Sequence, residues 1–257
     1  MVDPGLPGFR QMALDEALLT TLEPESSPLL RLYTWQNPTL SLGCFQDYKG
    51  VVCEPYIVHN KIDVVRRITG GRAVLHQHEV TYAVIAPRTG VFEGDSLRQT
   101  YQRIAEALNL AIRRLGVDES SLAWESGDVR PSLPQCFVTV SRYEISRDKR
   151  KVVGSAQKRL RDRFLQHGSI LLDFDSAMQS GCVNQPDPEI EKKIAPLNRQ
   201  VGRKIQFEEM VEHLSRAFAA SFEVEMIPSG LTPVECEAAR LLEPIYLSTG
   251  WTQNQCR

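Results

Sequence analysis

Hydrophobic residues recur with a spacing of three to four residues in several parts of the chain, which predicts amphipathic helices. The clearest helix covers residues 96–117, where six apolar residues form one stripe and Gly116 is a typical stop signal. The six are Ile104, Ala107, Leu108, Ala111, Ile112 and Leu115. The other predicted helices are 11–22, one that ends between Tyr56 and Ile62, 207–222, and 232–246.

Other segments alternate between apolar and polar residues, which predicts strands. The predicted strands are 28–35, 63–69, 79–87, 143–146, 151–159 and 167–173. Residues 63–87 are expected to form a strand pair joined by a loop that contains Gly70 and Gly71, and the last three strands an antiparallel meander. Because helices and strands mix without regular strand–helix–strand alternation, the expected fold class is α+β, with a mixed, largely antiparallel sheet flanked by helices.

The composition is that of an ordinary globular protein. Of the 257 residues, 42% are hydrophobic and 24% are charged, and the formal net charge is -2. This near balance argues against a protein whose whole surface coats nucleic acid or an anionic membrane. No apolar run approaches the ~20 residues that span a bilayer, and the opening residues lack the pattern of a secretory signal. We therefore expect a cytoplasmic monomer with one domain over residues 1–257 that ends in a short helical tail.

Six cysteines are scattered along the chain, and their spacing matches neither a disulfide framework nor a metal site. None belongs to a C-x-x-C pair or stands beside a histidine at zinc-ligand spacing, so no metal is expected. In a reducing cytoplasm the default is free thiols. Cys136 is a candidate nucleophile because it follows a proline-rich loop and precedes an expected strand, where a thiol is readily presented. The alternative is a small buried apolar residue.

A glycine-containing segment at residues 66–76 is the first candidate binding loop. Two adjacent glycines let the backbone approach a ligand closely, and arginines on either side add positive charge. The segment matches neither a P-loop nor a dinucleotide-binding fingerprint, and the alternative is a hairpin turn with solvated arginines. The candidate binding residues are Arg67, Thr69, Gly70, Gly71, Arg72 and His76.

A second candidate segment begins at Lys151, which opens a predicted strand that leads into small residues. Its ammonium group is suited to hold a carbonyl or phosphate oxygen, and the alternative is a surface lysine on an edge strand. The basic residues of 158–163 follow, and such a cluster is either a solvated loop or a surface that docks an acidic partner.

Two further sets of polar residues have ordinary structural interpretations as well. His167 and Gly168 stand at the head of a predicted strand, where a lone histidine is more often a structural hydrogen-bonding residue than a catalyst. Asp15 and Glu16 lie on the first predicted helix. One of these two carboxylates is expected to face solvent, and the other to hydrogen-bond a loop.

Six segments, in order along the chain, resemble the superfamily of lipoate–protein ligases, octanoyltransferases and biotin ligases. They are MALDEALL (12–19), LRLYTWQNPTLSLGCFQ (30–46), RRITGGRAVLHQHEVTYAVI (66–85), QCFVTVSRYEI (135–145), KVVGSAQKR (151–159) and LQHGSILLD (165–173). The most similar branch is the cysteine-dependent octanoyltransferases. The opening residues 1–11 match the strand that usually precedes the first segment poorly, so little strand is expected there.

The resemblance implies an acyltransferase catalytic domain that works in lipoate biosynthesis without a metal, nucleotide or other cofactor. It would move an octanoyl group from octanoyl-acyl carrier protein to a lysine of a lipoyl domain, on the glycine cleavage H protein or a dehydrogenase E2. Cys136 stands where that branch has the cysteine that carries the acyl group as a thioester, and Lys151 corresponds to the motif lysine. Segment 66–76 would line the acyl pocket. The other implied substrate-binding residues are Gly154, Ser155, Ala156, His167 and Gly168.

Other functions within and outside this class remain open. An ATP-dependent lipoate–protein ligase usually needs a C-terminal accessory domain, and the roughly 35 residues after 207–222 are too few for one. An amidotransferase between two lipoyl domains would use the same cysteine and lysine. A non-catalytic acyl- or lipoyl-binding protein predicts that Cys136→Ser keeps every function. A biotin ligase is disfavoured because its glycine- and arginine-rich loop is not seen.

Overall fold

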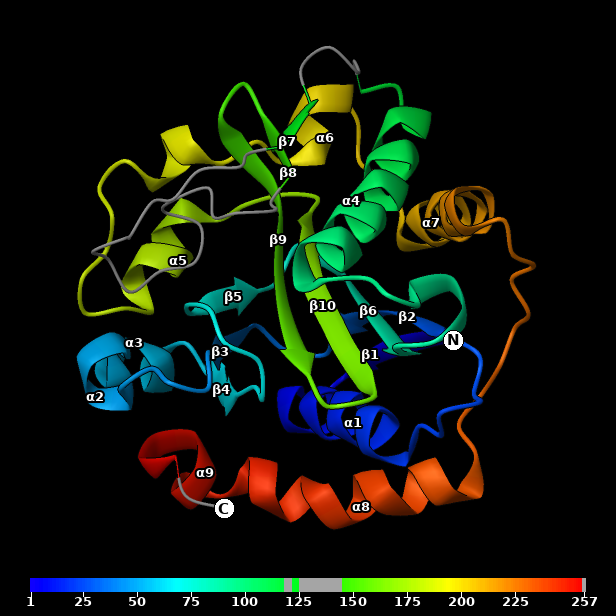
Figure 1. Cartoon of the computed structure of the whole chain (residues 1–257). Helices are drawn as coiled ribbons and strands as arrows, with labels where there is room; N and C mark the ends of the chain where they lie inside the picture. Colours follow the sequence, from blue (N-terminus) through cyan, green and yellow to red (C-terminus); the bar gives the residue numbers. More distant parts are fainter. Residues whose placement is uncertain (118–121, 125–144, 256–257) are drawn as a thin grey trace.

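The computed structural model describes residues 1–117, 122–124 and 145–255, and a seven-stranded sheet runs through its centre (Figure 1). The strand order is β1-β2-β6-β10-β9-β8-β7. β1 and β2 are parallel, and the other neighbouring pairs are antiparallel, which confirms the expected fold class. The strands are β1 (Val2–Leu6), β2 (Leu29–Trp35), β6 (Glu79–Pro87), β7 (Leu122–Trp124), β8 (Ile145–Arg147), β9 (Arg150–Arg159) and β10 (Arg163–Leu171).

Helices cover both faces of this sheet, with α4 and α7 on one face and α1 and α8 on the other (Figure 1). The central strand β6 shows the consequence, because all nine of its residues are buried. Its residues Val80, Tyr82 and Val84 pack on the α4 side, and Ala83 and Ile85 pack on the α1 side. The helices are α1 (Gly8–Thr21), α2 (Tyr48–Val51), α3 (Glu54–His59), α4 (Leu97–Arg114), α5 (Ser176–Gly181), α6 (Leu197–Val201), α7 (Phe207–Phe222), α8 (Pro233–Leu247) and α9 (Thr249–Asn254), with 3-10 turns η1 (Gly90–Phe92) and η4 (Ile190–Lys193).

A second, three-stranded sheet has the order β4-β3-β5 and places the glycine segment. It consists of β3 (Thr39–Leu42), β4 (Asp63–Arg66) and β5 (Val74–His76), with β3 parallel to β4 and antiparallel to β5. The expected strand pair over 63–87 is therefore wrong, because β4 pairs with β3 and β6 lies in the large sheet. The two glycines lie on the connection from β4 to β5 within this small sheet, and the chain crosses to the large sheet between β5 and β6.

The other predicted elements are present with small shifts at their ends. α7 and β6 have the predicted bounds, and the meander is confirmed as β8, β9 and β10. α3 ends at His59, and α9 was not predicted. The expectation of little strand in 1–11 is wrong, because β1 pairs with β2 at the edge of the large sheet. Proline and glycine conceal this strand in the sequence, and an edge position tolerates both.

The C-terminal helices are fastened to the two sheets by buried polar contacts. The hydroxyl of Tyr246 on α8 donates to Oε2 of Glu16 on α1 at 2.6 Å. The guanidinium of Arg66, at the end of β4, is fully buried and donates to the carbonyl oxygens of Trp251 (3.1 Å) and Thr252 (2.9 Å). The indole N–H of Trp251 donates back to the carbonyl oxygen of Arg66 at 2.8 Å.

The same guanidinium also holds the chain that follows β3. It donates to the carbonyl oxygens of Gly43 at 2.9 Å and Gln46 at 2.7 Å. Burial lowers the pKa of Arg66, and the surrounding carbonyl oxygens replace the water that the charge has lost. One side chain thus joins the small sheet to the C-terminal helix α9.

We predict that Arg66→Met lowers the free energy of unfolding by about 2–4 kcal/mol, because it leaves several buried carbonyl oxygens without a donor. Urea unfolding followed by circular dichroism measures the change. Arg240→Met is the control, because Arg240 lies on the exposed face of α8 and pairs with Glu237. An unfolding midpoint for Arg66→Met equal to that of the control variant would contradict the proposed fastening role.

Candidate active site

A small hollow of about 40 Å³ lies where the glycine segment meets the large sheet. Its walls come from α1, both sheets and the connection from β4 to β5, so residues far apart in the sequence contribute to it. Most of the candidate substrate-binding residues border it. The lining residues are Met12, Tyr33, Trp35, Ser41, Arg67, Gly71, Val74, His76, Thr81, Gly154, Ser155, Ala156, His167, Gly168 and Ser169.

The Gly70–Gly71 turn is packed too closely for larger residues at two points. Gly71 has φ +93°, a conformation that favours glycine, and a Cβ there would lie 2.9 Å from Nη2 of Arg67. A Cβ on Gly43 would overlap the carbonyl oxygen of Gly71. A Cβ on Gly71 would also lie 4.0 Å from Cβ of Ala156 on β9, so the turn lies against the small residues of that strand. The glycine segment (66–76) and the segment that begins at Lys151 therefore lie next to each other.

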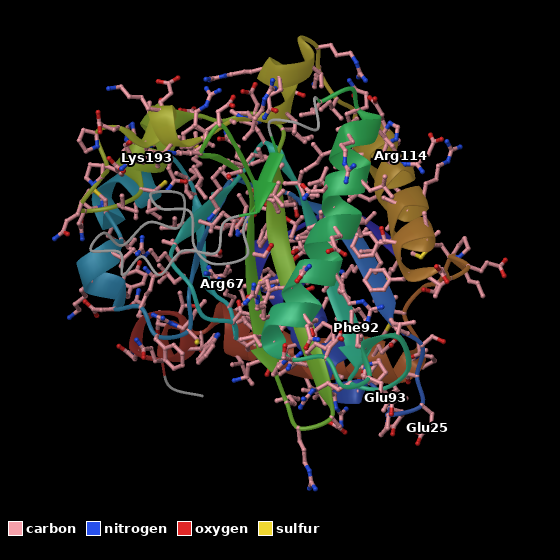
Figure 2. All side chains as sticks on the ribbon, turned by 45° about the horizontal axis from the view of Figure 1, so that its top comes forward. Glu25, Arg67, Phe92, Glu93, Arg114 and Lys193 are labelled. Carbon is pink, nitrogen blue, oxygen red and sulfur yellow. The ribbon has the colours of Figure 1, made fainter. Side chains whose placement is uncertain are left out.

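The side chain of Arg67 holds this turn from the inside of the molecule. Its Nη2 donates to the carbonyl oxygens of Gly70 (2.9 Å) and Arg72 (2.8 Å), and its Nη1 to the carbonyl oxygen of Ser41 (3.0 Å). Figure 2 shows Arg67 in the interior, whereas Arg114 at the end of α4 lies at the periphery. The alternative of a hairpin turn with solvated arginines is therefore wrong for Arg67 and for the fully buried Arg66.

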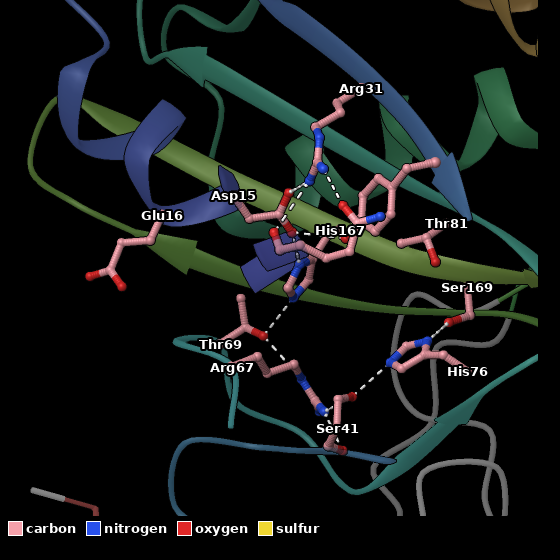
Figure 3. Close-up of polar contacts among 12 residues, drawn as sticks. Asp15, Glu16, Arg31, Ser41, Arg67, Thr69, His76, Thr81, His167 and Ser169 are labelled. Atoms are coloured by element: carbon pink, nitrogen blue, oxygen red, sulfur yellow. Dashed lines mark hydrogen bonds and ion pairs between the residues drawn. The ribbon is translucent and has the colours of Figure 1, made fainter. Parts of the chain in front are cut away.

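A first chain of polar contacts reaches Arg67 from α1 through His167 (Figure 3). Oδ2 of Asp15 contacts Nδ1 of His167 at 2.8 Å, and Nε2 of His167 contacts Oγ1 of Thr69 at 2.7 Å. The other carboxylate oxygen, Oδ1 of Asp15, accepts from Nη1 of Arg31 at 2.6 Å. Nε of Arg67 donates to Oγ1 of Thr69 at 3.1 Å, which completes the chain.

Burial and charge act in opposite directions on the two titratable groups of this chain. Burial lowers the pKa of His167, and the hydrogen bond and charge of Asp15 act in the opposite direction. Burial alone would raise the pKa of Asp15, but His167 and Arg31 outweigh it and hold that pKa below its usual range. The expectation that one of Asp15 and Glu16 faces solvent is wrong, since both side chains are buried.

A second chain reaches Arg67 from β6 through His76, and Figure 3 shows its part from His76 through Ser41 to Arg67. Oε1 of Glu79 contacts Nδ1 of His76 at 2.6 Å, and Nε2 of His76 contacts Oγ of Ser41 at 2.7 Å. Nη1 of Arg67 donates to the same Oγ at 3.0 Å. The ring of Trp35 stacks on that of His76, with centroids 4.1 Å apart. Neither Ser41 nor Glu79 was singled out from the sequence.

The register of β9 and β10 brings the remaining small candidate residues together. Ser155 pairs with Gly168, and Ala156 pairs with His167. A Cβ on Gly168 would overlap the carbonyl oxygen of Gly154, so the close packing of the two strands requires glycine there. Oγ of Ser155 lies 2.7 Å from the hydroxyl of Tyr82 on β6. The floor of the hollow is therefore built from small residues on adjacent strands.

The two candidate catalytic residues are placed differently. Lys151 is fully buried on β9, three residues before Gly154, and is not among the residues that line the hollow. The alternative of a surface lysine on an edge strand is wrong, because β9 lies between β10 and β8. Cys136 lies outside the residues that the structure describes, so its role stays a prediction.

The cysteines within the described residues are unbonded thiols. Cys44 and Cys53 are half-buried, and Cys236 is exposed. Burial raises the pKa of Cys182 to about 12, which makes it a poor nucleophile at neutral pH. In residues 1–117 and 145–255, no three His, Cys, Asp or Glu side chains gather closely enough to hold a metal ion. No helix described by the structure has the length and apolar character to cross a bilayer.

Comparison with known proteins gives one consistent family. Residues 7–219 match the family model of the lipoyl protein ligase A/B catalytic domain. The octanoyltransferase LipM of Moorella thermoacetica is 34% identical over 99% of this chain and 97% of its own. The octanoyltransferase LipM of Kyrpidia tusciae is 36% identical, with coverage of 93% and 92%.

Solved structures share the fold at lower sequence identity. A lipoate-protein ligase A bound with ATP has a TM-score of 0.84 at 23% identity and covers 98% of this chain and 96% of its own. The putative lipoate protein ligase Ta0514 of T. acidophilum, with bound lipoic acid, has a TM-score of 0.82 at 22% identity, with coverage of 99% and 96%. Sequence and fold agree, and the chain belongs to the lipoyl protein ligase A/B catalytic-domain family.

Proposed function

We propose that the protein transfers an octanoyl group from octanoyl-acyl carrier protein to a lysine of a lipoyl domain, through a thioester on Cys136. The acceptor would be the glycine cleavage H protein or a dehydrogenase E2. The acyltransferase class rests on the named octanoyltransferases that match this chain over nearly its full length. The observation that carries the proposal in the structure is that Gly71 and Ala156, from two candidate segments, line the same hollow.

The proposed chemistry needs no nucleotide, because the donor is already an activated thioester. The Cys136 thiolate attacks the octanoyl carbonyl carbon, a new C–S bond forms, and the carrier leaves as a thiol with a proton. The lysine amine then attacks the enzyme thioester, an amide forms, and the Cys136 thiol is restored. The proton that the lysine ammonium must lose goes to solvent. Exchange of one thioester for another has little free-energy cost, and the amide makes the second step favourable.

The hollow suits an apolar chain bordered by polar groups that fix its carbonyl end. Burial of each methylene contributes ~0.8 kcal/mol to binding. The hollow has about 40 Å³ of internal space between its described walls. Met12 on its wall has an unbranched side chain that can change rotamer at low cost.

Lys151 supplies the positive charge in this proposal. An ammonium group beside the carbonyl oxygen stabilises the negative charge that develops there, and it lowers the pKa of a neighbouring thiol. The support for this role is that Lys151 is buried on the strand that continues into Gly154, Ser155 and Ala156.

We predict that wild-type protein mixed with octanoyl-acyl carrier protein, without ATP, gains the mass of one octanoyl group, and that Cys136→Ser does not. The reason is that only a thiol exchanges readily with a thioester. Intact-mass spectrometry followed by peptide mapping measures the adduct. Cys53→Ser is the matched control and should be acylated like wild type.

Two other mixtures separate the competing functions. Free octanoate with ATP tests the ligase, for which the shared fold of an ATP-bound lipoate-protein ligase A is a specific reason. An octanoylated lipoyl domain as donor tests the amidotransferase. Acylation that occurs only in one of these mixtures would replace the carrier-protein reaction with the corresponding alternative.

We predict that Lys151→Met lowers the rate of Cys136 acylation by roughly 10²–10³-fold, the usual effect of removing one group that stabilises an oxyanion. Single-turnover mass spectrometry gives the rate. Lys149→Met is the control, because Lys149 is exposed in the turn between β8 and β9, two residues away. Equal acylation rates in the two variants would remove Lys151 from the mechanism.

We predict that reversing Lys158 and Arg161 to Glu raises KM for the acyl carrier protein and flattens the dependence of kcat/KM on salt. Both side chains are exposed at the hairpin between β9 and β10. Exposed basic residues speed association with an acidic partner, and salt screens that effect. Arg159 is left unchanged, because it donates to Oγ1 of Thr100 at 2.6 Å.

The control for this charge reversal is Lys204→Glu with Arg216→Glu, which changes the net charge equally at exposed positions next to and on α7. Kinetics over a series of NaCl concentrations provide the measurement. The hairpin has no docking role if the two double variants give the same KM and the same salt dependence.

A further inference from the structure

Arg67 is held by two chains of buried contacts that have the same order of chemical groups. In each chain a carboxylate contacts Nδ1 of a histidine, Nε2 of that histidine contacts a hydroxyl, and the hydroxyl accepts from the guanidinium. One chain is Asp15–His167–Thr69, and the other is Glu79–His76–Ser41. Figure 3 shows the first chain and the part of the second from His76 to Arg67. Their members come from α1, β3, β5, β6, β10 and the connection from β4 to β5.

The contacts of the first chain fit a neutral His167. Oγ1 of Thr69 accepts from Nε of Arg67, and the hydroxyl can donate its own proton to Nε2 of His167. The ring proton then lies on Nδ1 and is donated to Asp15. Burial favours this neutral form, because it lowers the pKa of His167. The second chain has the same order of contacts, from Glu79 through His76 to Ser41.

The Glu79–His76–Ser41 chain has the order of a nucleophilic serine with its base and orienting carboxylate. Ser41, however, is fully buried, its Oγ accepts from Arg67, and its carbonyl oxygen accepts from the same guanidinium. Glu79 is anchored in turn by the hydroxyls of Thr81 (2.6 Å) and Ser169 (2.8 Å). This serine is placed to hold Arg67 rather than to attack a substrate.

The guanidinium of Arg67 connects the two chains to the backbone that borders the hollow. Its Nη2 donates to the carbonyl oxygens of Gly70 and Arg72, on either side of Gly71. Glycine has wide backbone freedom, so these two hydrogen bonds restrain a segment that is flexible by itself. The orientation of Arg67 therefore affects where the turn lies.

We propose that Ser41 and Thr69 are positioning residues of the acyl-transfer site, whose hydroxyls hold Arg67 and the Gly70–Gly71 turn in the active arrangement, and that protonation of His167 weakens this hold. This inference rests on the proposed function, because the turn borders the hollow assigned to the acyl group. It adds to that function by making the rate of octanoyl transfer depend on the protonation of His167, which does not itself react.

Protonation of His167 changes the first chain by hydrogen bonding and by charge. A proton on Nε2 becomes a donor to the hydroxyl of Thr69, which then accepts from both His167 and Arg67 and directs its own proton elsewhere. The groups that face His167 are Asp15 on α1, Arg67 and His76, and Arg31 and Tyr33 on β2 lie behind Asp15. His76 faces Glu79 on β6 and the ring of Trp35 on β2. Positive charge on His167 repels Arg67, so acid loosens the hold on the turn.

The test compares Thr69→Val, which removes the hydroxyl at nearly constant volume, with Thr69→Ser, which keeps it. Protein labelled with ¹⁵N in glycine and histidine suits nuclear magnetic resonance titration, because the chain has only 16 glycines and five histidines. In wild type, the Gly70 and Gly71 amide signals should shift with the midpoint of His167. In Thr69→Val that midpoint should rise, since neutral His167 loses a donor, and the glycine signals should cease to follow it.

Kinetics give the second readout of the same variants. We predict that Thr69→Val lowers kcat/KM for octanoyl transfer roughly ten- to a hundredfold, because small displacements at a reacting site are costly. The acid limb of the pH profile should move to higher pH, and Thr69→Ser should restore both quantities. Thr100→Val is the control, because it removes a buried threonine hydroxyl that accepts from Arg159 on the far side of the large sheet.

The proposal is overturned if the glycine signals follow His167 equally in wild type and Thr69→Val, or if Thr69→Ser behaves like Thr69→Val. Ser41→Ala repeats the test through His76 if Thr69→Val does not fold. An octanoyl ester on Ser41 would identify a nucleophile and also overturn the positioning role. Failure of the proposed function is distinct, because it appears as absence of the Cys136 adduct, which the histidine titration does not measure.

Discussion

Two adjacent buried arginines connect the parts of this fold. Arg66 and Arg67 follow one another at the end of β4, and alternate side chains of a strand point to opposite faces. Arg66 turns to the C-terminal helix α9, and Arg67 turns to the glycine turn. A buried guanidinium is tolerated only where acceptors surround it, so each arginine fixes the backbone segments whose carbonyl oxygens it contacts. The position of the hollow depends on both.

The local pattern of the sequence was enough to predict most helices and strands. The 207–222 helix and the 79–87 strand have the predicted bounds, because each buries a long face with a clear period. It was harder to predict from the sequence which strands pair with each other. Residues 63–66 look like half of a hairpin, but they pair with Thr39–Leu42, and only contacts between distant segments decide that choice. β1 was missed because it depends on the edge of a sheet that is not visible locally.

The glycine segment and the small residues after Lys151 were recognised from the sequence, whereas most of the polar groups behind them were not. Asp15 and His167 are 152 positions apart, so nothing in local periodicity links them. A signal for Ser41 and Glu79 does exist. Ser41 stands between two core leucines, and Glu79 begins a strand that is otherwise apolar apart from Thr81. Polar residues at buried positions need partners, and such positions indicate a site.

The hydrogen bonds from Arg66 to α9 also determine when this part of the fold can form during synthesis on a ribosome. Gly43, Gln46 and Arg66 leave the exit tunnel early, but the carbonyl oxygens of Trp251 and Thr252 are made almost two hundred residues later. Until then the guanidinium of Arg66 has only some of the carbonyl oxygens that accept its hydrogen bonds in the folded protein. The strand that leads into the glycine turn is thus secured only after α9 has been synthesised.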